Sequence, residues 1–164
     1  SGGVDSSRVS ADTTWTQPWG EVRRVRDHHR ELRVVVQETS ATRRRLVVVF
    51  RAFNDGIGFR YELPEQDALR DFEISDELTE FTFADNAHAW WIPANRPSMD
   101  RYEYLFGNSP LSMLDSVHTP LTLTTNTGLH VVIHEAALID YAAMDLARVG
   151  ERTLRPWLAR GPMV

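Results

Sequence analysis

The sequence has 164 residues, of which 42% are hydrophobic and 25% charged, which is typical of a globular domain with one substantial core. Its net charge of −5 argues against a nucleic-acid-binding protein. The longest apolar runs are strand-sized and fall short of the roughly 18 residues that a membrane span needs. The absence of cysteine excludes disulfides, thiolate nucleophiles and cysteine-based zinc sites, and the absence of lysine excludes a Schiff-base lysine.

In the first half of the chain, short apolar runs separated by turn sequences predict β-strands. Apolar residues predict strands over residues 31–37 and 45–53, and the second of these is apolar on both faces. Asn54-Asp55-Gly56 is a tight-turn sequence, because Asn and Gly tolerate a positive φ. Hydrophobic alternation then resumes over residues 57–63. These features predict a β-hairpin over residues 45–63.

The second half of the chain also consists of short apolar runs separated by turn sequences. Further strands are predicted over residues 78–83, 87–92, 102–106, 117–125 and 129–135. The turn sequence Asn126-Thr127-Gly128 joins the last two as a second hairpin. Residues 136–149 contain good helix formers, but Leu138, Ile139 and Tyr141 fit an extended strand equally well, so the pattern leaves this segment undecided.

Glu135 is the first candidate for a functional residue. On the strand predicted over residues 129–135, Val131, Ile133 and Glu135 share one face, because successive side chains alternate. A carboxylate that continues an apolar face is costly unless it is paired, hydrogen-bonded or bound to a metal. The alternative is a strand end at which Glu135 simply emerges into water. A His-Glu-x-x-His zinc motif is excluded, because Leu138 stands at the position of the second histidine.

The tryptophans form the second candidate group. Trp15 and Trp19 lie beside Pro18 and Gly20, and Trp90 and Trp91 lie shortly before a proline. Indoles in such segments can form flat surfaces on which sugar rings stack, but tryptophans also bury large areas in cores and interfaces. Both interpretations remain open, and the four tryptophans are candidate substrate-binding residues. We assign no catalytic residue, because neither a Gly-x-Ser-x-Gly nucleophile turn nor a glycine-rich phosphate loop is present.

Several long motifs in a fixed order resemble one enzyme family. They are DTTWTQPWGEVR at residues 12–23, NDGIGFRYE at 54–62, SDELTEF at 75–81, AWWIPA at 89–94, VHTPLT at 117–122 and IHEAAL at 133–138. Over residues 12–147 the chain resembles the N-terminal domain of the glycoside hydrolase family 97 enzymes, which are α-glucosidases and α-galactosidases. The tail after residue 147 is only loosely similar to the family.

The resemblance implies a fold and a set of partners. It implies an antiparallel β-sandwich of the super-sandwich type over residues 1–147, truncated at its N-terminal edge. Residues 148–164 would then lead toward a catalytic (β/α)8 barrel of the same polypeptide that is absent from this chain. It further implies that Glu135 is one carboxylate ligand of an active-site calcium ion, whose other ligands and catalytic carboxyls belong to the barrel. Calcium takes about six to eight oxygen ligands, so Glu135 alone does not make a site.

The expected function follows from this resemblance. We expect a non-catalytic domain of a calcium-dependent α-glycosidase that forms part of the wall around an oligosaccharide, and we expect this chain alone to be inactive. One alternative is a free-standing carbohydrate-binding module that uses the tryptophan loops, and another is an interaction domain that self-associates. The resemblance implies a periplasmic or secreted protein, the usual location for this family. The first residues lack the features of a signal peptide. We expect the chain to be a fragment.

Overall fold

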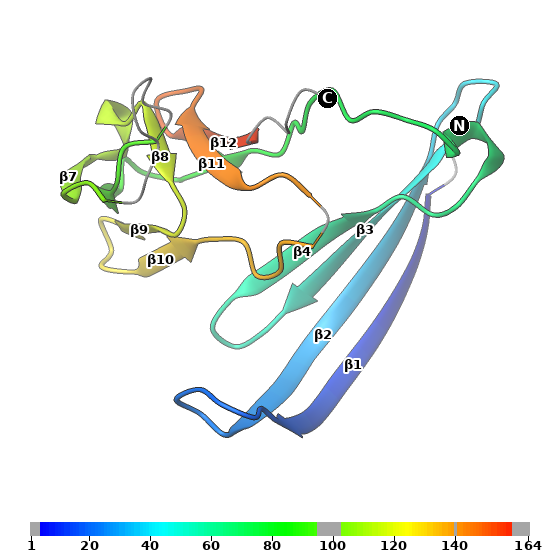
Figure 1. The fold of residues 1–164 in the computed structure, drawn as a ribbon, viewed down its shortest axis with the longest axis horizontal. Coiled ribbons are helices and arrows are strands. Elements are labelled where there is room, and N and C mark those ends of the chain that lie inside the picture. The colour runs from blue at the N-terminus through cyan, green and yellow to red at the C-terminus, as the bar shows by residue number, and fades with distance from the viewer. Residues whose placement is uncertain (1–3, 95–102, 140, 159–164) are drawn as a thin grey trace. The chain divides into compact units, whose positions relative to one another are not determined.

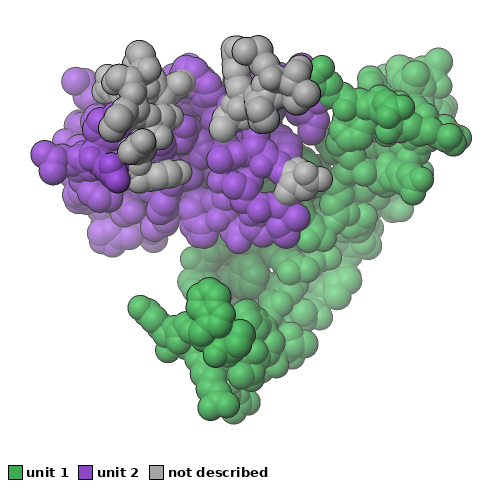
Figure 2. Space-filling view, in the orientation of Figure 1, with its two compact units in different colours: residues 1–73 green, residues 74–164 purple. Residues whose placement is uncertain are grey.

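The computed structural model describes residues 4–94, 103–139 and 141–158, which form β-strands and two short 3-10 helices (Figure 1). The chain divides into two compact units, Ser1–Glu73 and Ile74–Val164 (Figure 2). All of the paired strands run antiparallel in the part of the chain that the structure describes. The predicted all-β class is therefore confirmed.

The first unit contains one four-stranded sheet in the order β1-β2-β3-β4. Its strands are β1 (Val4–Thr16), β2 (Arg24–Gln37), β3 (Arg45–Ala52) and β4 (Ile57–Glu62), and a 3-10 helix, η1 (Asp67–Leu69), follows them. The predicted hairpin is confirmed, because Ala52 pairs with Ile57 and the Phe53 N–H donates to the Gly56 carbonyl at 2.8 Å. Each connection joins neighbouring strands, so the unit is a meander.

The long β1–β2 ribbon differs from expectation, because strands were predicted only from residue 31 onward. Strand β1 pairs with β2 from Val4 to Thr16, although every residue along it except Ala11 is exposed. Small polar and charged residues dominate β1, so the strand shows little of the hydrophobic alternation that marks a strand in a sequence. Backbone pairing and cross-strand contacts such as the 2.7 Å ion pair between Arg26 and Asp12 hold it instead.

The second unit contains two four-stranded sheets. One has the order β10-β9-β6-β7 and consists of β6 (His88–Trp91), β7 (Gly107–Pro110), β9 (Leu121–Thr124) and β10 (His130–Ile133). The other has the order β5-β12-β11-β8 and consists of β5 (Phe81–Thr82), β8 (Ser116–His118), β11 (Met144–Arg148) and β12 (Thr153–Leu158). A second 3-10 helix, η2 (Leu111–Met113), links β7 to β8.

Both sheets of the second unit contribute to one apolar core. Its buried members are Ala87, Ala89, Leu111, Leu114, Val117, Leu121, Leu123, Ile133, Leu146 and Leu154. Seven of these residues come from strands of the two sheets, as expected when two sheets pack face to face, and Ala87, Leu111 and Leu114 lie in the adjoining connections. The predicted β-sandwich is confirmed.

Several predicted strand boundaries differ from the structure. The strand predicted over residues 117–125 is two strands, β8 and β9, which belong to different sheets and are separated by a cis peptide bond between Thr119 and Pro120. The strand predicted over 78–83 is reduced to β5. The strand predicted over 102–106 begins outside the described residues, and regular structure resumes only at β7. The predicted hairpin around Gly128 is confirmed as β9–β10, with Gly128 at a φ of 83°.

The segment that the sequence left undecided between helix and strand contains β11, and its other described residues are irregular. Strand β12 lies in the tail after residue 147 and pairs with β11. The paired residues begin with Met144 opposite Leu158 and end with Arg148 opposite Leu154. No helix among the described residues is long and apolar enough to cross a membrane.

Candidate functional site

Glu135 lies two residues beyond the end of β10, at the margin of the sandwich. The predicted alternation holds up to this point, because Ile133 is buried in the core and Val132 is 54% exposed on the opposite face. The Glu135 side chain is half-buried, and its carboxylate forms no hydrogen bond or ion pair with any residue that the structure describes. The His134 ring lies against the backbone here, with Nδ1 2.9 Å from the Glu135 carbonyl oxygen.

The connection that carries Glu135 runs from β10 in one sheet to β11 in the other. It exposes two large apolar side chains, Leu138 at 50% and Ile139 at 79%. At its far end the Tyr141 hydroxyl donates to the Glu77 carboxylate at 2.8 Å, and the Thr79 hydroxyl donates to the other oxygen of that carboxylate at 2.8 Å. Glu77 is therefore engaged as a hydrogen-bond acceptor, whereas the Glu135 carboxylate has no such partner in the described part of the chain.

The oxygen chemistry of Glu135 fits one ligand of a calcium ion. A hard divalent cation prefers carboxylate and carbonyl oxygens and needs several of them. Residues 4–94, 103–139 and 141–158 hold no cluster of three His, Asp or Glu side chains that could bind a metal. A calcium site that used Glu135 would therefore draw most of its ligands from outside the described residues. The role of Glu135 as a ligand stays a prediction.

The four candidate tryptophans lie in different places. Trp15 is near the end of β1 and is 51% exposed, and Trp19 is in the β1–β2 turn and is 85% exposed. Gly20, which follows Trp19, has a φ of 124°, and the Gln17 amide donates to the Val22 carbonyl inside this turn. These two indoles belong to the first unit and the other two to the second.

Trp90 and Trp91 are neighbours on β6 and point to opposite faces of its sheet. Trp90 is 39% exposed on the outer face. Trp91 packs against the core, and its indole N–H donates to the Ser109 hydroxyl at 3.0 Å. The structure therefore places Trp90 on a surface and Trp91 in the packing of the sandwich, and it does not bring the two rings together.

The second unit also holds a buried polar pair that sequence reasoning did not single out. His118 on β8 is 5% exposed, and its Nδ1 donates to the Asp145 carboxylate on β11 at 2.8 Å. The neighbouring Thr119 hydroxyl donates to the Met144 carbonyl at 2.8 Å. No local sequence signal marked this pair, because the burial of Ser116, His118 and Thr119 is seen only in the structure. Side-chain hydrogen bonds to an Asp145 oxygen and to the Met144 carbonyl thus join β8 and its following residue to β11, in addition to the backbone ladder.

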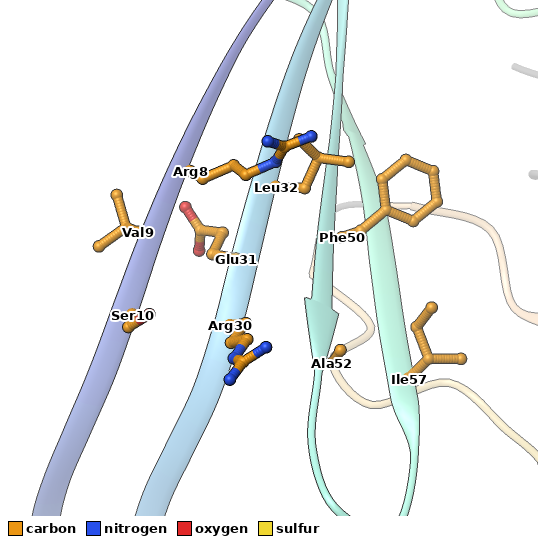
Figure 3. Close-up of a pocket in the computed structure, with 9 residues that line it drawn as sticks. All are labelled: Arg8, Val9, Ser10, Arg30, Glu31, Leu32, Phe50, Ala52 and Ile57. Carbon is orange, nitrogen blue, oxygen red and sulfur yellow. The ribbon is translucent and has the colours of Figure 1, made fainter.

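A pocket of about 750 Å³ lies on the sheet of the first unit. Figure 3 shows Phe50 and Ile57 projecting to the same side of this sheet, with Arg8 and Arg30 among the other lining residues. Its one acidic lining residue, Glu31, forms an ion pair with Arg51 at 2.8 Å. A glycosidase centre needs two carboxyls that flank the scissile bond, and this pocket lacks such a pair.

Charge pairing in the first unit also points away from acid catalysis. The pKa of Asp12 is lowered by its hydrogen bonds from Arg26, and Arg44, Ser40 and Thr42 together lower the pKa of Glu38 to about 2. A glycosidase general acid needs the opposite shift, a raised pKa that keeps its proton near neutral pH. These carboxylates are therefore suited to structural ion pairs.

Comparisons with known proteins agree on one family. A family model described as "Glycosyl-hydrolase 97 N-terminal" matches residues 3–158. A glycoside hydrolase family 97 enzyme from Pseudoalteromonas sp. strain K8, solved in complex with acarbose, is 41% identical with a TM-score of 0.89. The match covers 96% of this chain and 24% of that chain. A variant of a family 97 enzyme from the same strain, solved with panose, is 42% identical with a TM-score of 0.88, over 94% of this chain and 23% of that one.

A more distant structure shares the fold alone. A β-arabinopyranosidase matches with 18% identity and a TM-score of 0.78, over 93% of this chain and 26% of that chain. In each of these comparisons the chain spans about a quarter of the matched protein. The relatives therefore contain further domains in the same polypeptide.

Proposed function

Because the chain belongs to glycoside hydrolase family 97 and matches its N-terminal domain, we propose that it completes the active site of a calcium-dependent α-glycosidase without catalysing the reaction itself. In this proposal the partner is a catalytic (β/α)8 barrel of the same polypeptide, and the substrates are oligosaccharides with α-glucosidic or α-galactosidic bonds. The small share of the matched enzymes that the chain covers supports a separate catalytic domain. A periplasmic or secreted location belongs to the same proposal.

The position of Glu135 is the observation that carries the proposal. Its side chain is half-buried at a sandwich edge and has no hydrogen-bonding or ionic partner among the described residues. The carboxylate oxygens of Glu135 still reach solvent and are therefore open to a cation that would compensate their charge. A shared calcium ion supplies that compensation and, when bound, stabilises charge that develops at the sugar. Glu135 contributes one oxygen ligand and thereby ties this domain to the barrel.

A domain exchange tests this function. Residues 1–158 replace the matching segment of the Pseudoalteromonas family 97 enzyme, which is 41% identical to them. We expect the chimera to hydrolyse an aryl α-glucoside, and we expect a calcium chelator to suppress this activity reversibly. The proposed role would be contradicted by a soluble, folded chimera whose hydrolytic activity is unchanged by the chelator under conditions in which the parent enzyme loses activity.

The exposed tryptophans favour a second candidate function, a carbohydrate-binding module. Trp19 is 85% exposed in the β1–β2 turn, and its indole offers a large apolar surface on which a sugar ring could stack. Saturable binding of maltooligosaccharides by the lone chain, lost on Trp19→Ala, would support this function. Binding that survives Trp19→Ala would reject it for this turn.

A further inference from the structure

The outer face of the β10-β9-β6-β7 sheet carries aromatic, amide and hydroxyl side chains. Its members are the outward-facing side chains of four adjacent strands, and none is buried: His88, Trp90, Asn108, Pro110, Thr122, Thr124, His130 and Val132. None of these eight residues is an Asp, Glu or Arg, although 25% of the whole sequence is charged. We call this surface the Trp90 face.

The strand register arranges the Trp90 face in two rows. In the first row Asn108 pairs with Trp90, Trp90 with Thr122, and Thr122 with Val132. In the second row His88 lies between Pro110 and Thr124, and Thr124 pairs with His130. Side chains directly opposite each other in a sheet are about 5 Å apart, so hydrogen-bonding groups flank the indole on both sides.

Neighbouring side chains hold Trp90 in place. The His88 ring packs edge-on against the indole, with ring centroids 5.7 Å apart and planes at 72°. His88 Nε2 in turn donates to the Asn108 side-chain oxygen at 2.6 Å. The Thr124 hydroxyl and His130 Nδ1 are 2.9 Å apart in the second row. An indole fixed by its neighbours loses little conformational freedom when a ligand stacks on it.

We propose that the Trp90 face binds a neutral α-linked gluco-oligosaccharide, with one pyranose ring stacked on Trp90. A sugar ring offers an apolar C–H face to an aromatic surface and a rim of hydroxyls to amide, imidazole and hydroxyl groups. The Asn108 amide and the Thr122 hydroxyl lie on either side of the indole, where that rim would fall. The absence of Asp, Glu and Arg from this face suits an uncharged ligand, because no carboxylate or guanidinium is left unpaired when water leaves the surface.

The choice of an α-glucan rests on the proposed function, whereas the neutral saccharide class follows from the Trp90 face itself. The face differs from the tryptophan turn of the first unit and from the calcium role of Glu135. Failure of binding at Trp90 and failure of calcium dependence through Glu135 are therefore separate results.

Isothermal titration of maltoheptaose into the 164-residue chain tests the proposal. We expect saturable binding that Trp90→Ala weakens by at least about tenfold, the size of effect that one lost aromatic contact of roughly 1.4 kcal/mol produces. Trp157→Ala is the matched control, because Trp157 is also an exposed strand tryptophan of the second unit, at 48%, but pairs with Asp145 on the other sheet. We expect this variant to bind like the original chain.

Two further variants keep the test decisive if Trp90→Ala does not fold. Asn108→Ala and Thr122→Val remove a flanking polar group while leaving the indole, and we expect each to weaken binding severalfold with an unchanged circular dichroism spectrum. Absence of binding in the original chain, or equal binding in the Trp90 and Trp157 variants, would overturn the proposal. Self-association that depends on Trp90, without saccharide binding, would also overturn it and assign the face to a second copy.

Discussion

Gly107 lies directly against the indole of Trp91, its partner across the β6–β7 pair. A Cβ added to Gly107 would come within 2.6 Å of Trp91 Cε2 and 2.7 Å of Cζ2. Trp91 is itself packed against the core of the second unit, so its ring has little room to move. The glycine is required here for space, because any other residue would displace the ring.

We therefore expect Gly107→Ala to destabilise the chain by about 1–3 kcal/mol, the usual cost of overpacking a well-filled site. Gly58→Ala is the control, because a Cβ at this strand position meets nothing within 4 Å. It should be neutral or slightly stabilising, since Ala is favoured over Gly in a strand interior by roughly 0.5–1 kcal/mol. Urea unfolding of both variants measures the difference, and equal stabilities would contradict the packing account.

The His118–Asp145 pair lies in the other sheet of the sandwich, β5-β12-β11-β8, and should contribute to the free energy of unfolding. Asp145→Ala removes the carboxylate that accepts from a 5% exposed imidazole, which should lower the free energy of unfolding by about 1–3 kcal/mol. Asp67→Ala removes an aspartate from an exposed ion pair with Arg70, and an exposed pair of this kind contributes roughly 0–1 kcal/mol. Thermal unfolding of the two variants should separate them clearly. A midpoint for Asp145→Ala equal to that of Asp67→Ala would show that the buried pair adds nothing.

The fold was predictable wherever hydrophobic alternation and turn chemistry coincided. Ile57, Phe59 and Tyr61 alternate with polar residues after an Asn-Asp-Gly turn, and the hairpin formed as expected. Strand β1 shows no such alternation, because backbone pairing rather than burial holds it. The sequence did not predict that residues 117–125 divide between two sheets, because an apolar strand pattern does not show which sheet a strand joins.

Glu38 predicts a pH dependence in the β2–β3 turn. Its carboxylate accepts from Arg44, Ser40 and Thr42, which lower its pKa from 4.5 to about 2. A lowered pKa in the folded state gives stability that is present above about pH 4.5 and is lost as the pH falls toward 2. The chain should therefore be more stable than Glu38→Gln at pH 7, and the gap should close by pH 2. Urea unfolding across this range checks the sign, and a gap that widens on acidification would contradict it.

Hydrolysis by the isolated chain is predicted to be absent, because the two catalytic carboxyls of a glycosidase are expected in the barrel. Incubation of the purified chain with an aryl α-glucoside and an aryl α-galactoside, with the Pseudoalteromonas enzyme as the positive control, measures this directly. Release of the aryl group above the buffer rate would show that this chain carries its own catalytic centre.

The candidate site was only partly predictable for a physical reason. The alternation of Val131 and Ile133 was predictable from the strand period, but β10 ends at Ile133, so the direction of the Glu135 side chain does not follow from it. The pairing of His118 with Asp145 joins residues 27 positions apart and depends on a sheet order that no local pattern specifies. The opposite orientations of Trp90 and Trp91 follow from the strand predicted over residues 87–92, because successive side chains of a strand alternate.

The calcium dependence of the chimera tests the central claim most directly. The calcium concentration that gives half-maximal hydrolysis should rise by at least about tenfold in Glu135→Gln, because one of the few charged ligands becomes neutral. Glu151→Gln, which neutralises an exposed carboxylate in the β11–β12 turn, should leave that concentration unchanged. A Glu135→Gln chimera that responds to calcium at the same concentration as its parent would contradict the claim that Glu135 binds the ion.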